Sequence, residues 1–241
     1  MPYKNKTPTS TEISLLKNNN TIYFAQSDVN TNSIWHLIQG IWQEHSPEAR
    51  TLLRERIYTT EKLSPLNHGI IKIAAKRVAA EQNPEDLEKI LANAKNKIQI
   101  QFTNSYQPPT AYLKQLNQKL TQEELVRLLK NLTAVAPKTE HRYQQDRAVG
   151  AVLLDKDNTL LALAHNTNHQ NKTLHAEVNL LQTWQKPLPD GSRLITSLEP
   201  CKMCAGLIHS YVENPKNFRL EFLENDHGPA TRQSWITTHR I

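Results

Sequence analysis

The chain carries two short motifs, His175-Ala176-Glu177 and Pro200-Cys201-Lys202-Met203-Cys204, from which its fold and its chemistry can be inferred. Each motif follows a β-prone segment and precedes apolar residues at helical spacing, so each is expected to open a helix. Two thiolates three residues apart at a helix start can bind one metal ion, and a histidine at a neighbouring helix start supplies a third ligand. The motifs therefore predict a metal site formed by His175, Cys201 and Cys204.

Zinc is the expected metal, because sulfur and imidazole ligands at this spacing are typical of zinc sites. Three protein ligands leave one position for water, whose pKa zinc lowers towards neutrality. The positive dipole ends of the two helices favour the thiolate forms of the cysteines. Glu177 lies two residues after His175, close enough to take a proton from that water without binding the metal. Glu177 is therefore the predicted catalytic residue.

The segments around the motifs alternate between helix and strand. Thr121 and Glu124 have the spacing of a capping box, and leucines at helical spacing follow them. Strands are expected at 148–154 and 159–164, and the later elements are expected as helix, strand, helix and strand at 175–184, 193–197, 201–211 and 218–222. This order predicts an α/β domain over residues 120–241, a three-layer fold with a mixed sheet.

The first part of the chain, residues 1–110, is expected to form a separate and mainly helical domain. Apolar residues recur at helical spacing over 34–42, 70–78 and 87–91. Short β-prone runs at 21–25 and 98–102 are the expected strands of this part. The segment Gln107-Pro108-Pro109-Thr110 is the candidate linker between the two domains.

The composition is that of a globular protein, with 38% hydrophobic and 22% charged residues. The formal net charge is +6, and residues 1–120 carry 15 Lys+Arg against 10 Asp+Glu, a net of +5. A basic surplus favours acidic partners such as nucleic acid. A solvated surface that keeps the protein soluble explains a surplus of this size equally well.

Nothing in the sequence predicts an association with membranes. No apolar run approaches the roughly 20 residues that cross a bilayer, and the first residues lack the apolar stretch of a secretory signal. Only two cysteines occur, Cys201 and Cys204, and their spacing fits metal binding or redox chemistry better than a disulfide framework. The expected location is the cytoplasm.

Taken together, the motifs resemble the signature of the zinc-dependent cytidine and deoxycytidylate deaminase superfamily, His-x-Glu followed by Pro-Cys-x-x-Cys. The stretch Ser-Leu-Glu-Pro-Cys-Lys-Met-Cys-Ala-Gly-Leu-Ile-His-Ser, residues 197–210, is especially similar to the tRNA adenosine deaminase branch. The resemblance covers roughly residues 121–222. It implies hydrolytic deamination of a nucleobase, with adenosine in tRNA converted to inosine, and it implies substrate contacts by Val149, Asn166 and Ala176.

Other functions stay open at this level. The same metal and carboxylate serve deamination of cytosine, guanine or a free nucleotide. A structural zinc site, a thioredoxin-like redox site and a non-catalytic scaffold that binds nucleic acid or protein are the remaining alternatives. The sequence also leaves open a homodimer, and substrate contacts by His165, His169, Glu199 or the last residues, 221–241.

Overall fold

The structure is a computed structural model that describes residues 11–28, 32–75, 77, 80–136, 147–168, 171–227, 231 and 238–240. The chain divides into two compact units: the amino-terminal unit ends at Thr103 and the carboxy-terminal unit begins at Asn104. The segment expected as a linker, 107–110, lies after this division. Each unit contains a five-stranded sheet. None of the helices in the described part of the chain is long and apolar enough to span a membrane.

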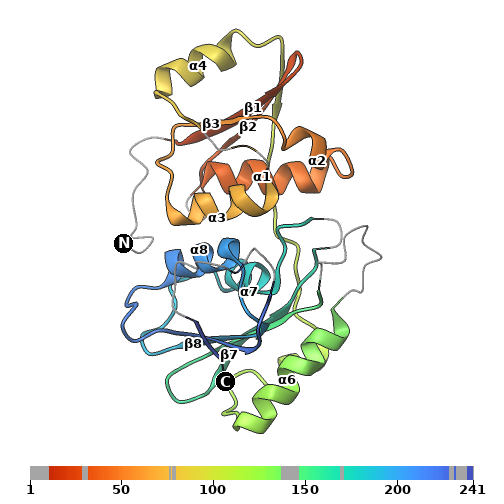
Figure 1. The fold of residues 1–241 in the computed structure, drawn as a ribbon, viewed down its shortest axis with the longest axis vertical. Helices are drawn as coiled ribbons and strands as arrows, with labels where there is room; N and C mark the ends of the chain where they lie inside the picture. The colour runs from red at the N-terminus through yellow and green to blue at the C-terminus, as the bar shows by residue number, and fades with distance from the viewer. Residues whose placement is uncertain are drawn as a thin grey trace. The chain divides into compact units, whose positions relative to one another are not determined.

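The amino-terminal unit alternates short strands with helices around its sheet, whose strand order is β4-β3-β1-β2-β5. Its strands are β1 (Ile13–Asn18), β2 (Thr21–Gln26), β3 (Ile57–Thr59), β4 (Ala80–Glu81) and β5 (Asn96–Gln99), and its helices are α1 (Ser33–Glu44), α2 (Ala49–Leu52), α3 (Pro65–Ala74) and α4 (Pro84–Ala92). Helix α4 lies on one face of the sheet, and α1 and α3 lie on the other (Figure 1). Both faces of the sheet are therefore covered.

The sequence led us to expect a mainly helical domain with strands at 21–25 and 98–102. The structure confirms the first strand as β2, and β5 overlaps the second, but the five-stranded sheet was not expected. The helices at 34–42 and 87–91 are confirmed as α1 and α4, and the helix expected at 70–78 is α3, which ends at Ala74; residues 76, 78 and 79 lie outside the described residues. Strand β1 has no alternating pattern because Ile13, Ser14, Leu15 and Leu16 are all buried, as expected for a strand covered on both faces. Strands β3 and β4 have only three and two residues, too few for a periodicity to be seen.

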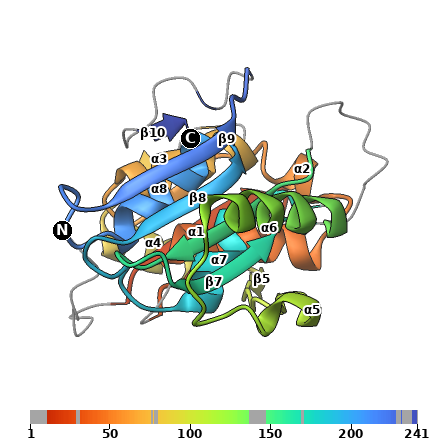
Figure 2. The same cartoon turned by 90° about the horizontal axis from the view of Figure 1, so that it is seen from below.

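The carboxy-terminal unit has the expected mixed α/β architecture. Its strands are β6 (Gly150–Leu154), β7 (Leu160–His165), β8 (Arg193–Leu198), β9 (Arg219–Glu224) and β10 (Thr238–Arg240), and its helices are α5 (Thr110–Leu113), α6 (Gln122–Val135), α7 (Ala176–Trp184) and α8 (Lys202–Tyr211). The strand order is β10-β9-β8-β6-β7. Strand β6 is antiparallel to β7 and β8, whereas β8, β9 and β10 are parallel to one another, and Figure 2 shows β8 and β9 side by side.

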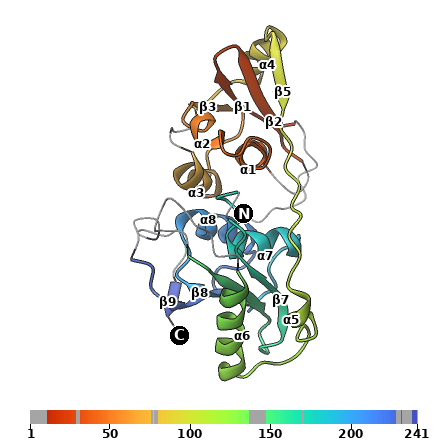
Figure 3. The same cartoon turned by 90° about the vertical axis from the view of Figure 1, so that its right-hand side faces the viewer.

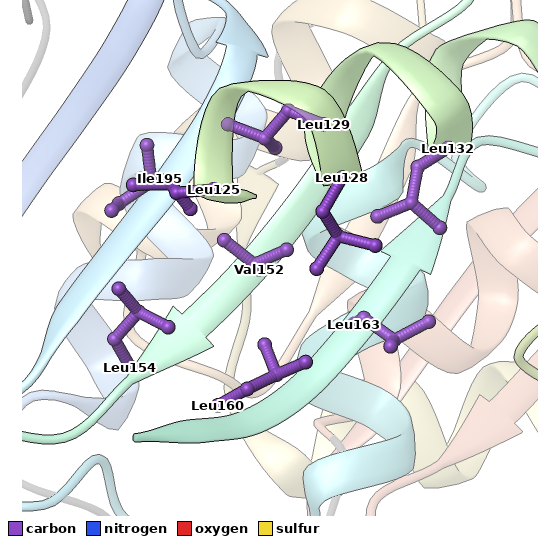
Figure 4. Close-up of a cluster of buried hydrophobic side chains, with 9 residues drawn as sticks. All are labelled: Leu125, Leu128, Leu129, Leu132, Val152, Leu154, Leu160, Leu163 and Ile195. Atoms are coloured by element: carbon purple, nitrogen blue, oxygen red, sulfur yellow. The ribbon is translucent and has the colours of Figure 1, made fainter. Parts of the chain in front are cut away.

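Helix α6 covers one face of this sheet with a row of leucines. The predicted capping box at Thr121 and Glu124 is present, and the buried cluster under the helix comprises Leu125, Leu128, Leu129, Leu132, Val152, Leu154, Leu160, Leu163 and Ile195 (Figure 4). Each fully buried leucine contributes roughly 1.5–3 kcal/mol through removal of apolar surface from water. Gly150 allows the close approach, since a Cβ there would lie 2.8 Å from the Leu132 Cβ.

Helices α7 and α8 cover the opposite face, so the unit has three layers (Figure 3). Helix α7 packs on β6 and β7 and also against α8. Both helices begin after the carboxyl end of a strand, since β7 ends at His165 and β8 ends at Leu198. This arrangement brings the amino ends of α7 and α8 together.

Candidate metal and catalytic site

The three predicted ligands meet where α7 and α8 begin. His175 is the N-cap residue of α7, and Cys201 is the N-cap residue of α8. Cys204 lies in the first turn of α8, and both cysteines are buried and free of disulfide bonds. Among the residues that the structure describes, these three form a group that could hold a metal ion, with their ligand atoms within 4.8 Å of one another.

The distances between the ligand atoms fit a tetrahedral zinc ion. The His175 Nδ1 lies 3.6 Å from the Cys201 Sγ and 3.5 Å from the Cys204 Sγ, and the two sulfurs are 3.6 Å apart. With Zn–S of about 2.3 Å and Zn–N of about 2.0–2.1 Å, tetrahedral angles require about 3.6 Å between nitrogen and sulfur and about 3.8 Å between sulfurs. The donor atoms are therefore spaced as a zinc ion would space them.

The electrostatic environment of the two thiols differs although they are neighbours. The hydrogen bond with Cys204 holds the pKa of Cys201 well below its ordinary value. Burial raises the pKa of the Cys204 thiol well above its ordinary value. One thiolate is thus favoured on the pair and a second thiolate is opposed. A divalent cation at the centre of the triangle would favour the second thiolate as well.

Glu177 lies in the first turn of α7 and is buried, with 3% of its surface exposed. Burial raises the pKa of its carboxyl group, while the charge of His175 and a hydrogen bond with Cys204 act in the opposite direction. A raised pKa makes a carboxylate a better proton acceptor and lets it hold the proton until the proton is passed on. The structure thus places Glu177 beside the ligand triangle, where the sequence predicted a proton carrier.

The three predicted substrate contacts lie near the same helix start. Ala176 is the buried first residue of α7, and Val149 is half-buried just before β6. The Asn166 side chain accepts a hydrogen bond from the Val149 N–H at 2.7 Å, and its Nδ2 donates to the Asn168 Oδ1 at 2.7 Å and to the Arg147 carbonyl at 3.2 Å. Both donors of the Asn166 amide are therefore used within the protein, and one lone pair of Oδ1 remains for a ligand. Contact of these residues with a substrate stays a prediction.

Side chains that the sequence did not single out hold the loops around the site. The buried Asn179 on α7 donates to the His165 carbonyl and to the Thr167 hydroxyl at 2.9 and 3.0 Å. The Ser197 hydroxyl accepts from the Gly150 N–H at 3.0 Å. Asn179 is a polar residue between the apolar Val178 and Leu180. That position is the feature of the sequence that could have indicated its role.

Tyr106 supports the end of β7. Its hydroxyl accepts a hydrogen bond from the His165 N–H at 2.9 Å, and its ring meets the His165 ring edge-on at 5.4 Å between centroids. His165 also contacts the Asn166 carbonyl through Nδ1, at 3.1 Å. His165 is thus held by the protein itself. Glu199 accepts from the Asp226 N–H at 3.3 Å, and His169 lies outside the described residues.

Comparison with known families supports the deaminase resemblance. Residues 140–240 match the family model of the Bd3614-like deaminases. The matched segment contains the three candidate ligands and Glu177. The match confirms, for this part of the chain, the resemblance to the deaminase superfamily that the two motifs predicted. None of the curated proteins matches the chain.

Solved deaminase structures resemble the chain only distantly. A structure from a study of A-to-I editing by tRNA:A34 deaminases is 24% identical, with a TM-score of 0.29, and the similarity covers 39% of this chain and 82% of that one. The guanine deaminase from Nitrosomonas europaea is 19% identical, with a TM-score of 0.40, and the similarity covers 58% of this chain and 88% of that one. The apo dCMP deaminase from the cyanophage S-TIM5 is 18% identical, with a TM-score of 0.34, and the similarity covers 49% of this chain and 95% of that one. Similarities of this size do not assign a substrate to this chain.

Proposed function

We propose that the carboxy-terminal unit is a zinc-dependent deaminase that hydrolyses the exocyclic amine of a nucleobase. The observation that carries the proposal is the triangle of His175, Cys201 and Cys204, spaced for zinc, with the buried carboxyl group of Glu177 beside it. A perturbed carboxyl group beside a metal-ligand set is typical of catalytic sites. This arrangement favours chemistry over a purely structural role.

His175, Cys201 and Cys204 would hold the ion, which, when bound, supplies an activated water as the nucleophile. Glu177 takes one proton from the water and delivers it to the ring nitrogen next to the carbon under attack. It then moves a second proton to the departing amino group, so that ammonia leaves and an oxo group replaces the amine. Glu177 ends in its starting state, and water is the only co-reactant consumed.

Two alternatives are less well supported by the geometry. A closed structural zinc site has four protein ligands, whereas the ligand group found in the described part of the chain has three. A thioredoxin-like redox site needs its two cysteines alone, but here the His175 Nδ1 approaches both sulfurs within 3.6 Å. A third donor at that distance favours metal binding.

For the substrate, we propose adenosine in RNA, with tRNA as the preferred RNA. The support is the similarity of residues 197–210 to the tRNA adenosine deaminase branch, together with the net charge of +6 and a pI near 9.2. Basic proteins bind RNA through its phosphates and release counterions on binding. Cytosine, guanine and free nucleotides are the competing substrates.

Incubation of the zinc-loaded full chain with tRNA and, separately, with free nucleosides and nucleotides separates these substrates. The products are digested to nucleosides and identified by mass spectrometry. We expect inosine from tRNA and no turnover of the free compounds. Uridine or xanthosine as the sole product would overturn the adenosine assignment while leaving the deaminase chemistry intact, and no product from any substrate would overturn both.

A further inference from the structure

A basic pocket lies in the carboxy-terminal unit, away from the ligand triangle. Its volume is about 630 Å³, and its charged lining side chains are Lys156, Arg193, Lys216 and Arg219. Of the described residues that line it, none is an aspartate or a glutamate. The pocket therefore presents one sign of charge.

The pocket is built at the end of the sheet opposite to the metal ligands. Arg193 and Arg219 are the first residues of the parallel strands β8 and β9 and are direct neighbours in register. The other end of β8, at Leu198, leads to Cys201. Six strand residues at about 3.3 Å each separate the two ends by roughly 17 Å, so one bound nucleotide would not fill both places.

Arg193 is held in place by two partners. Its Nη1 donates to the Glu221 Oε2 at 2.8 Å and its Nη2 donates to the Asn158 Oδ1 at 2.7 Å. Glu221 balances the charge of Arg193. The guanidinium group is thus oriented before any ligand arrives, which reduces the entropic cost of binding.

The other three cations of the pocket have no such partner among the residues that the structure describes. Lys156, Lys216 and Arg219 are exposed, and none of them forms an ion pair with a residue of the described chain. The nearby Asp190 accepts hydrogen bonds from Asn217 instead. The pocket therefore carries an excess of about three positive charges, and adjacent like charges are unfavourable until an anion lies between them.

Two residues with a left-handed backbone conformation lie at the edge of the pocket near Lys156. Gly191 has a φ of +73° and Asn158 a φ of +64°. A Cβ at Gly191 would lie 3.2 Å from the Lys156 Cβ, so the turn before β8 packs directly against the turn between β6 and β7. The position of Lys156 is thereby constrained by the backbone around it.

We propose that this pocket binds phosphate groups. Arginine presents paired N–H donors to phosphate oxygens, and lysine adds charge without a directional requirement. The phosphate comes either from the backbone of an RNA that extends past the metal site or from a free compound such as pyrophosphate. The inference goes beyond the proposed function because binding here does not require deamination.

The test compares two double variants of the full chain with the wild type. Lys216→Ala/Arg219→Ala removes two pocket cations, and Lys114→Ala/Lys130→Ala removes two exposed cations of the same unit that do not line the pocket. All four residues are exposed, and circular dichroism verifies that both variants fold. Pyrophosphate affinity is measured by calorimetry, and the affinity for single-stranded RNA is measured against salt concentration.

We expect the pocket variant to lose about tenfold or more in pyrophosphate affinity, or to reduce the salt slope of RNA binding by about 1.4, at about 0.7 for each lost phosphate contact. The control variant should match the wild type on both measurements. A loss with pyrophosphate alone identifies a free phosphate compound as the ligand, and a reduced slope with RNA identifies the backbone. The proposal is overturned if the wild type binds neither probe, or if the two double variants behave alike. Neither readout depends on turnover, so failure of the proposed deamination would leave the result interpretable.

Discussion

Replacing Tyr106 with phenylalanine should destabilise the carboxy-terminal unit and change its response to alkaline pH. The Tyr106 hydroxyl accepts the His165 N–H at 2.9 Å, and phenylalanine leaves that donor at the end of β7 without its acceptor. A hydrogen bond of this kind contributes about 0.5–1.5 kcal/mol to stability. At pH 8 the free energy of unfolding of Tyr106→Phe should therefore be lower than that of the wild type by about this amount.

The pH dependence follows from the buried phenol. Burial raises the pKa of Tyr106 from an ordinary value of 10 to about 12, although the hydrogen bond from His165 acts in the opposite direction. The folded protein therefore keeps this proton where the unfolded chain releases it. The resulting stabilisation is complete below pH 10 and is lost as the pH rises through 12. By pH 11 the loss is about 1 kcal/mol, once the remaining solvent access of the phenol is allowed for.

Urea denaturation at pH 8, 9, 10 and 11, followed by circular dichroism, measures both effects. The wild type should lose its advantage over Tyr106→Phe as the pH rises, because the other alkaline titrations are common to both proteins. Two outcomes would contradict the role assigned to Tyr106. One is equal stability of the wild type and the variant at pH 8, and the other is a difference in their free energies of unfolding that stays constant up to pH 11.

Three further outcomes are expected. Cys201→Ser or Cys204→Ser should lose most of the bound zinc, measured by elemental analysis, because the triangle loses a thiolate; full occupancy in both variants would show that the ligands are wrongly assigned. Chelation of zinc from the wild type should lower its Tm, since a ligand that binds only the folded state stabilises it; an unchanged Tm would contradict a site formed only on folding. Gly150→Ala should cost about 1–3 kcal/mol in the free energy of unfolding, because the new methyl group would meet the Leu132 Cβ at 2.8 Å; an unaltered urea midpoint would show that α6 can move away at little cost.

The candidate site was predictable from the sequence because its chemistry lies in two contiguous motifs. His175, Cys201 and Cys204 need only two helix starts to be brought together, and the order of helices and strands indicated that arrangement. The supporting residues were not predictable in the same way. Tyr106 reaches His165 across 59 positions, and no local pattern in either segment indicates that contact.

The sheet of the amino-terminal unit shows a second limit. Strand β1 is buried at four successive positions, so its sequence has neither the alternation of a half-exposed strand nor the spacing of a helix. The short strands β3 and β4 are formed by pairing with β1 and with each other, which a local reading cannot detect. Strand β10 has three residues and was missed for the same reason, whereas the long helices α1 and α6 were found from their regular apolar spacing.

In the proposed reaction, Glu177 moves the protons of a zinc-dependent deamination. The most direct test of this role is the rate of inosine formation on tRNA by the wild type and by Glu177→Gln, with the zinc content of both proteins measured in parallel. The amide keeps the size of the side chain but cannot accept the proton, so the variant should keep its zinc and lose about 10²–10⁴ in rate. Full zinc occupancy with near-normal turnover in Glu177→Gln would show that another group moves the protons.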